Sequence, residues 1–182
     1  PMQHQRIASR DGARIRGESA RSGVDSVYLQ CDAADDAAHE ILRGRRCLPE
    51  KLEAIRACGE AGIGVVLVAT VAAGVNADRL WPLVEMGLRL GAHVRGVHFQ
   101  PMSSFGRCPW RSDGAPRVTL PEIAAELERQ SQGQIRWTDF HPPGCENSAV
   151  FLQCRLSEKR GNIGAGAGRF FLLRLRGNAV RR

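Results

Sequence analysis

Apolar and amphipathic segments alternate along the chain. Residues 63–71, IGVVLVATV, are almost wholly apolar and β-branched, as expected of a parallel strand that is buried on both faces. Shorter apolar stretches at 25–32 and 94–99 end in polar residues and predict two further strands. The segment 134–140, QIRWTDF, predicts a fourth.

Helical signals fill the spaces between these predicted strands. Residues 35–46 predict a short helix, and Pro49 stands in the first turn of a second one, where its missing N–H costs nothing. Asn76 is predicted to be the N-cap of a third helix. Thr119 precedes a fourth helix and forms a capping-box pattern with Glu122.

Strands that alternate with helices imply right-handed crossovers and a parallel sheet, so the predicted fold class is α/β. Three or four such units are too few to close an eight-stranded barrel, which leaves a barrel segment or an open sheet. We expect residues 1–22 to be a loosely ordered basic lead-in, 23–147 a partial β/α barrel, and 148–182 a basic tail.

The net charge of +7 belongs to the ends of the chain. Residues 1–22 hold five Arg against two acidic residues, and 155–182 hold eight Lys or Arg against Glu158, whereas 23–154 carry more acidic than basic groups. Basic tails are more often solvated than specific, so no specific nucleic-acid partner is expected. The sequence shows neither an apolar run of membrane-spanning length nor a secretory signal segment, and we expect a cytoplasmic location.

Six cysteines are scattered over the sequence, at positions 31, 47, 58, 108, 145 and 154. No two of them are spaced as C-x-x-C, which excludes a zinc ribbon and a thioredoxin-like motif. Without a signal segment, reduced thiols are expected rather than disulfides.

Polar side chains follow the predicted strands at their carboxyl ends. These ends converge on one side of a parallel sheet, so the side chains are expected to meet around a polar ligand, although each one alone could merely cap a strand or a helix. The residues concerned are Gln30, Asp32, Thr70, Asn76, Gln100 and Ser103. The loop 102–116 that follows the third strand is long enough to be functional or disordered.

Other polar residues carry less specific signals. His98 and His141 stand near strand ends, where they could carry protons or ligate a metal, or could be hydrogen-bonded parts of the structure. Arg43, Arg45 and Arg46 could bind a phosphate or carboxylate, although a solvated helix end accounts for them more simply.

Several motifs, taken in order, resemble the radical S-adenosylmethionine superfamily. They are VYLQCDA with the LRG that follows it, VLVATVAAGVN, VRGVHFQPMSSFGR, VTLPEI and DFHPPGCEN. The branch that looks nearest is that of the tetraether-lipid-synthase-like and pterin-methyltransferase-like enzymes, which carry similar Q-x-D, G-V-N and F-Q-P-x-S-x-x-G-R signatures. The resemblance covers residues 24–147.

The resemblance implies a partial (β/α) barrel of six core strands, of which this chain would hold roughly the last three β/α units. It also implies that the complete enzyme reduces S-adenosylmethionine at a [4Fe–4S] cluster, cleaves it to methionine and a 5′-deoxyadenosyl radical, and abstracts hydrogen from a C–H bond. The positions that match cofactor-binding ones are Gln30, Asp32, Thr70, Asn76, Gln100 and Pro101. On the substrate side are Ser103, Ser104 and Arg107.

The sequence departs from the superfamily in two motifs. The C-x-x-x-C-x-x-C loop that holds the cluster is absent from it, and so is the glycine-rich segment with an acidic residue that receives the methionine amino group. Scattered cysteines do not easily substitute, since cluster ligands on one loop are preorganised at close spacing. No cluster is therefore expected on this chain alone. No metal site is predicted, and Cys145 and Cys154 are only weak candidates for metal ligands: the family tends to carry another cysteine after the G-C-E-N motif, and here only Cys154 lies nearby.

We therefore interpret the chain as the carboxyl-terminal part of a radical S-adenosylmethionine enzyme that supplies cofactor wall and substrate side and is inactive alone. The substrate is expected to be a small or lipid-like molecule. One alternative is a degenerate binding or scaffold module without catalysis, and another is an unrelated α/β enzyme that uses His98 or Cys108. The strand at 25–32 would be an exposed edge, which predicts self-association.

Overall fold

The apolar segment at the centre of the sequence forms the strand β2 (Gly64–Val71), which pairs in parallel with β1 (Ser26–Gln30) on one side and β3 (Val94–Pro101) on the other. A computed structural model describes residues 23–102, 117–142, 151–159, 162–165 and 171–176. The three predicted strands are confirmed, and with them the parallel α/β arrangement of this part of the chain.

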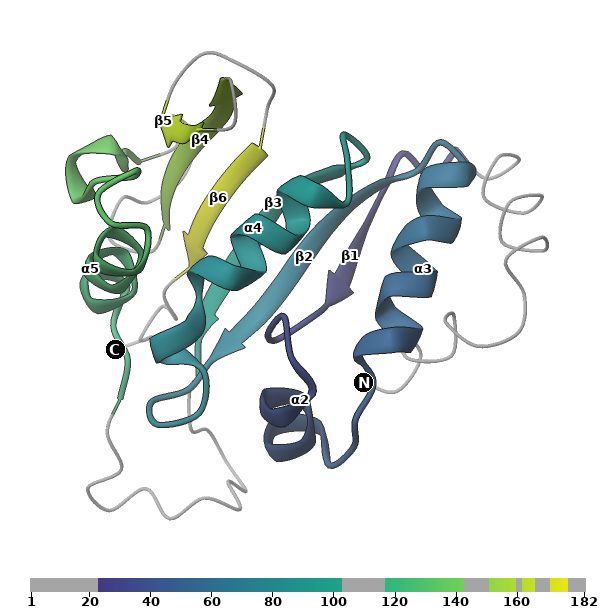
Figure 1. The fold of residues 1–182 in the computed structure, drawn as a ribbon, viewed down its shortest axis with the longest axis horizontal. Coiled ribbons are helices and arrows are strands. Elements are labelled where there is room, and N and C mark those ends of the chain that lie inside the picture. Colours follow the sequence, from purple (N-terminus) through teal and green to yellow (C-terminus); the bar gives the residue numbers. More distant parts are fainter. Residues whose placement is uncertain (1–22, 103–116, 143–150, 160–161, 166–170, 177–182) are drawn as a thin grey trace.

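The strand beside β3 comes from the end of the chain. It is β6 (Phe171–Arg176), which runs parallel to β3, while β4 (Phe151–Lys159) and β5 (Asn162–Ala165) continue the sheet in antiparallel fashion. The described strands thus form an open sheet in the order β1-β2-β3-β6-β4-β5 and not a closed barrel (Figure 1). Strands β4, β5 and β6 all lie within 148–182, which was predicted from the sequence to be a basic tail.

The predicted strand at 134–140 is wrong. The structure has a short 3-10 helix, η2 (Trp137–Asp139), at this place. Its turn is stabilised locally, because the Arg136 backbone N–H donates to Asp139 Oδ2 at 2.7 Å and the Trp137 N–H donates to Glu128 Oε2 at 2.8 Å. These side-chain acceptors replace the ladder partners that a strand would need.

Within the described residues, four α-helices connect and cover the strands: α2 (Asp36–Arg43), α3 (Leu48–Glu60), α4 (Trp81–Arg89) and α5 (Leu120–Gln130). The Asp35 carboxylate caps α2, which ends at Gly44 with the left-handed φ of 74° that glycine adopts without strain. The predicted capping box of Thr119 and Glu122 is confirmed at the start of α5.

The helix after β2 begins differently from the prediction. A 3-10 turn, η1 (Ala77–Arg79), precedes α4, and the side chain of Asn76 makes no cap hydrogen bond to it. The acceptor at the start of α4 comes from α5 instead, where Gln130 Oε1 accepts from the N–H groups of Leu80 at 2.6 Å and Trp81 at 3.0 Å. The prediction that Asn76 is an N-cap is therefore wrong.

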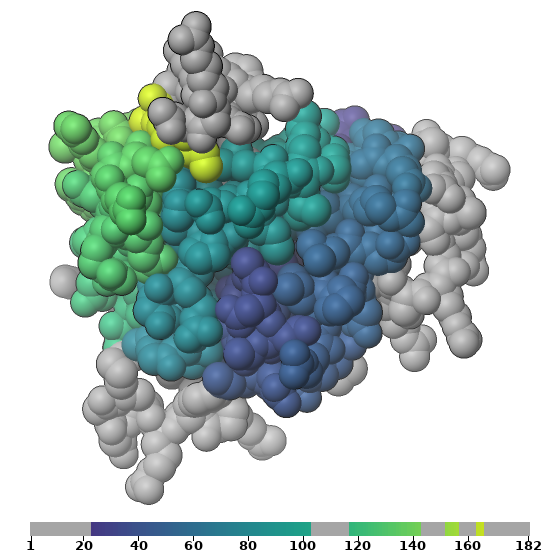
Figure 2. Space-filling view, in the orientation of Figure 1, coloured from purple at the N-terminus to yellow at the C-terminus, as the bar shows by residue number. Residues whose placement is uncertain are grey.

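The hydrophobic core lies between one face of the sheet and helices α3, α4 and α5, which all cover the front of the sheet in Figure 1. In the space-filling view from the same side, residues of these helices close over that face (Figure 2). The core joins alternate residues of the parallel strands to the helices; among them are Val65, Leu67, Ala69, Val97, Phe99, Ile55, Val84 and Ile123.

The opposite face of the parallel strands carries a different set of side chains. Tyr28 on β1 is 62% exposed, and its ring makes an edge contact with that of the buried His98 on β3 at a centroid distance of 6.5 Å. Strand β1 has a strand neighbour on one side only within the described residues. Self-association through this edge, predicted from the sequence, stays a prediction.

None of the described helices is long and apolar enough to cross a membrane.

Truncating Phe99 tests the position of the core. Phe99→Ala is expected to lower the free energy of unfolding by about 3 to 5 kcal/mol, because the ring is fully buried beneath the helices. Urea unfolding followed by circular dichroism measures the loss. Tyr28→Ala removes an aromatic ring from the open face of the same sheet and is expected to cost about 1 kcal/mol or less. Equal losses in the two variants would contradict the assignment of the buried face.

Candidate functional site

A buried carboxylate stands where the chain leaves β1. The Asp32 side chain is 0% exposed and accepts hydrogen bonds from Arg43 of α2, with Nε to Oδ2 at 2.7 Å and Nη2 to Oδ1 at 2.8 Å. Planar two-point pairing of this kind is the strong form of an ion pair, because both guanidinium donors align with both carboxylate oxygens. The pair connects the end of β1 to the last turn of α2.

Thr70, on β2, joins this ion pair to the sheet. Its backbone N–H donates to Asp32 Oδ1 at 2.9 Å, and its hydroxyl oxygen accepts from Arg43 Nη2 at 3.0 Å. The side-chain amide of Gln30 donates to Asp32 Oδ1 at 2.7 Å and to Thr70 Oγ1 at 3.3 Å. The side chains of Gln30 on β1 and Arg43 on α2 and the backbone N–H of Thr70 on β2 therefore converge on one carboxylate.

Asn76 completes the arrangement from the loop after β2. Its side chain is buried and its amide nitrogen donates to the carbonyl oxygens of Asp32 and Thr70, both at 2.8 Å, while its Oδ1 accepts from the Ala72 N–H at 2.9 Å. This role explains why Asn76 does not cap α4. We call Gln30, Asp32, Arg43, Thr70 and Asn76 the Asp32 cluster.

His39, which was not among the site residues predicted from the sequence, binds the backbone of Asp32. His39 of α2 is fully buried, and its Nε2 accepts from the Asp32 backbone N–H at 3.1 Å. An amide N–H can only donate, so the other ring nitrogen, Nδ1, carries the proton and donates to the Asp35 carbonyl at 2.7 Å. His39 is thus a neutral side chain that orients the turn after β1. The feature of the sequence that could have indicated this role is the position of His39 four residues after the capping Asp35.

The structure brings four of the predicted cofactor-binding positions together, namely Gln30, Asp32, Thr70 and Asn76. Gln100 is the register partner of Thr70 on β3, so it stands beside the cluster on the same edge, followed by Pro101 as partner of Val71. The predicted substrate-side residues Ser103, Ser104 and Arg107, together with Cys108 and Cys145, lie outside the described residues.

The remaining sequence candidates lie apart from the cluster. His98 is buried on the face of the sheet opposite to the core helices, and His141 is bridged to β4 through its backbone. Arg45 forms an exposed ion pair with Glu50 at 2.6 Å, and Arg46 lies 3.7 Å from Asp36 in the first turn of α2. Only Arg43 of the basic group enters the cluster.

Two opposing effects set the protonation of Asp32. Burial alone would raise its pKa, but hydrogen bonds from Arg43, the charge of Arg43 and the hydrogen bonds from the Thr70 N–H and Gln30 together hold the pKa below its ordinary value. The cluster therefore contains a carboxylate and a guanidinium whose charges cancel. Its remaining polar groups are neutral.

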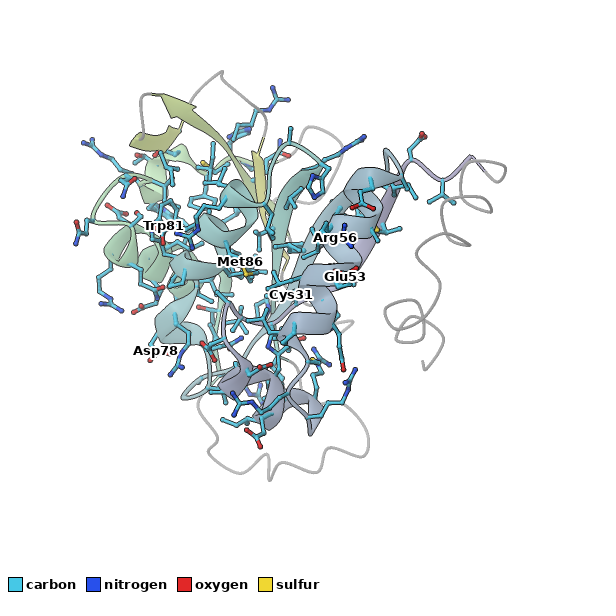
Figure 3. The ribbon with its side chains drawn as sticks, turned by 45° about the vertical axis from the view of Figure 1, so that its right-hand side comes forward. Cys31, Glu53, Arg56, Asp78, Trp81 and Met86 are labelled. Carbon is cyan, nitrogen blue, oxygen red and sulfur yellow. The ribbon has the colours of Figure 1, made fainter. Side chains whose placement is uncertain are left out.

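Three of the four thiols in the described residues are poorly suited to hold an iron–sulfur cluster. Burial raises the pKa of Cys31 and of Cys154 to about 12, and it also raises the pKa of Cys58. A cluster binds thiolates, which such buried side chains do not readily form. No group of three Cys, His, Asp or Glu side chains in the described parts of the chain is placed to hold a metal ion. Cys31 instead lies in the interior near α3 (Figure 3).

Two curated enzymes are similar to this chain, and no family model matches it. Over 122 residues, 66% of the chain, it is 33% identical to 7,8-dihydro-6-hydroxymethylpterin dimethyltransferase of Methanocaldococcus jannaschii. Over 118 residues, 65% of the chain, it is 40% identical to PqqA peptide cyclase of Streptomyces rochei. The matches cover 24% and 31% of those two proteins, so the chain corresponds to a quarter to a third of their length.

Replacing the buried carboxylate tests the cluster. Asp32→Asn is expected to lower the free energy of unfolding by about 3 kcal/mol at neutral pH, because Arg43 loses its charged partner. The folded-state pKa of Asp32 lies below the unfolded-state value of about 3.9, so its stabilisation is present above that pH and is lost as the pH falls through the folded-state pKa. Urea unfolding across this acid range should show a shallower pH dependence in the variant than in the unchanged chain.

The matched control is Asp78→Asn, the same change on η1, where the side chain is 67% exposed (Figure 3). It is expected to alter the unfolding free energy by about 0.5 kcal/mol or less. An Asp32→Asn variant as stable as this control would contradict the assigned ion pair.

Proposed function

We propose that this chain supplies part of the S-adenosylmethionine-facing wall of a radical S-adenosylmethionine enzyme. The proposal rests on one observation above the others: three of the motifs that resemble this superfamily form the neighbouring parallel strands β1, β2 and β3, and the polar carboxyl ends of β1 and β2 meet in the Asp32 cluster. The similarity to a pterin dimethyltransferase supports it, since the motifs resemble a pterin-methyltransferase-like branch. The similarity to a peptide cyclase points to the same superfamily.

The cluster's electrostatics suit a neutral part of the cofactor. The charges of Asp32 and Arg43 neutralise one another, and the Asp32 side chain is 0% exposed. Gln30 and Thr70 are only partly buried, and they offer an amide and a hydroxyl at the strand ends beside Gln100. Amide and hydroxyl groups pair with the nitrogen and hydroxyl groups of a nucleoside, whereas an anion would need unpaired positive charge. The adenosine moiety therefore fits this wall better than the methionine carboxylate.

We assign different roles to the predicted cofactor-binding residues. Gln30, Thr70 and Gln100 are proposed to contact the nucleoside, with Pro101 as an apolar neighbour. Asp32 and Asn76 are proposed to hold these contacts in place, because their side-chain polar atoms are occupied within the protein. The further proposal that Ser103, Ser104 and Arg107 face the substrate rests on the motif resemblance alone.

The complete activity is proposed for a longer assembly than the described residues. A radical S-adenosylmethionine enzyme needs a cluster to reduce its cofactor, and the described thiols do not fit one. We therefore place the cluster ligands outside these residues and derive no step that involves them. Because the names of the two relatives indicate a pterin and a peptide as their substrates, we carry neither over to this chain.

Nucleoside binding is the first test of the proposal. The 182-residue chain is expected to bind S-adenosylhomocysteine, and Gln30→Ala should weaken binding about tenfold by removing one hydrogen-bonding partner. Isothermal titration calorimetry measures both affinities. Gln134→Ala changes an exposed glutamine in the turn after α5 and serves as the control that retains full affinity. Absence of binding, or equal loss in both variants, would contradict the proposed wall.

Reconstitution separates the enzyme hypothesis from a binding module. Anaerobic treatment of the 182-residue chain with iron and sulfide is expected to give no stoichiometric [4Fe–4S] cluster, because the described residues bring no three ligands together and burial raises the pKa of Cys31, Cys58 and Cys154. Visible absorption and iron analysis measure this. A stoichiometric cluster that cleaves S-adenosylmethionine would overturn this expectation. A longer chain containing the cluster-binding motif should cleave the cofactor, and its failure to do so would favour the non-catalytic module.

A further inference from the structure

The orientation of the Gln30 amide can be deduced from its partner. The atom of this amide that lies 2.7 Å from Asp32 Oδ1 must be the nitrogen, since a carboxylate oxygen only accepts hydrogen bonds. The same nitrogen lies 3.3 Å from Thr70 Oγ1. The amide oxygen, Oε1, is therefore the part of Gln30 that remains as an acceptor. A turn of the amide by half a revolution would place two acceptors against each other.

The Thr70 hydroxyl is oriented by the same logic. Its oxygen accepts from two donors, Gln30 Nε2 at 3.3 Å and Arg43 Nη2 at 3.0 Å. A hydroxyl oxygen has two acceptor positions, so these two bonds occupy both and leave the hydroxyl hydrogen as a donor. Within the described residues this hydrogen has no acceptor. Thr70 therefore presents a donor next to the Gln30 acceptor.

Arg43 and Asp32 keep both groups in these orientations. Arg43 donates to Asp32 and to Thr70 from one nitrogen, which connects the carboxylate with the hydroxyl. The arginine comes from the last turn of α2, whose first turn is fixed by the Asp35 cap and whose His39 binds the Asp32 backbone. The guanidinium is thus supplied by an element that is itself attached to the turn after β1.

We propose that the Asp32–Arg43 ion pair is a positioning device that fixes the hydrogen-bond polarity of the ligand wall, with Gln30 Oε1 as acceptor beside the Thr70 hydroxyl as donor. This inference rests on the proposed function and extends it. The ligand group that matches this wall has a donor next to an acceptor and bears no charge. In an adenosine compound, both the ribose diol and the amino edge of the base have this character.

The orientation is tested first without any ligand. The signal of the Gln30 side-chain amide in the 15N NMR spectrum of the 182-residue chain is assigned by comparison with Gln30→Ala. One of its two protons should be shifted downfield, and this proton should exchange slowly with water. Both features follow from its hydrogen bond to the buried carboxylate. A Gln30 amide with the shift and exchange rate of exposed glutamines would overturn the proposal, whatever the chain binds. This measurement needs no variant of the ion pair.

The positioning role is tested with Arg43→Lys. Lysine keeps the positive charge but cannot donate from a planar fork to Asp32 and Thr70 together. We expect nucleoside affinity to fall about tenfold and the Gln30 amide to lose part of its protection. Asp32→Asn should act in the same direction, and circular dichroism shows which variants are folded. Arg45→Lys, in an exposed ion pair with Glu50, is the matched control and should change neither property.

A comparison of three ligands identifies which group of the nucleoside binds to Gln30 and Thr70. Adenosine is compared with 2′,3′-dideoxyadenosine, which lacks the diol, and with purine riboside, which lacks the exocyclic amine. The analogue that loses affinity about tenfold identifies the group, and this loss should disappear in Gln30→Ala. Equal affinity for all three ligands, or an Arg43→Lys variant that behaves as the unchanged chain, would overturn the positioning role. A protected Gln30 amide in a chain that binds no nucleoside would instead contradict the proposed function.

Discussion

A carboxylate without contact with water must find compensating partners, and this requirement at Asp32 organises the carboxyl end of the parallel strands. Its two oxygens are occupied by Arg43 from α2, the backbone of Thr70 on β2 and the amide of Gln30 on β1. Removing any one donor would leave part of a buried charge unsatisfied, which is costly. The ends of two strands and a helix are consequently fixed relative to one another by one side chain.

Local signals were sufficient for some elements, but they missed β4, β5 and β6 and failed where a residue binds a partner that lies far away in the sequence. The apolar run of β2 and the capping box of Thr119 are complete within a few residues, so the sequence predicts both. Asn76 has a good N-cap sequence, yet its amide binds Asp32, which lies 44 residues earlier. Nothing local distinguishes a cap from such a long-range bond, because asparagine satisfies either geometry.

The sequence predicts where the candidate site lies, but not which of its residues are buried supports and which face a ligand. Polar residues after successive strands indicate that Gln30, Asp32 and Thr70 would meet, since parallel strands end on one side of a sheet. Their division into a buried support and a partly exposed wall depends on Arg43, which is 11 residues from Asp32 and equally suited to a solvated helix end. Only the three-dimensional structure shows which of the three neighbouring arginines finds the carboxylate.

In this cluster, the interactions that neutralise the charge of Asp32 also orient the neutral side chains beside it. A lone glutamine at a strand end could present either its oxygen or its nitrogen to a ligand, because the two orientations of the amide have the same shape. Beside a carboxylate that is itself satisfied by arginine, one orientation is repelled and the other is bonded. The buried ion pair thereby gives an uncharged wall a defined polarity. Buried ion pairs add little net stability compared with apolar packing, so fixing such a polarity is a physical reason to keep one here.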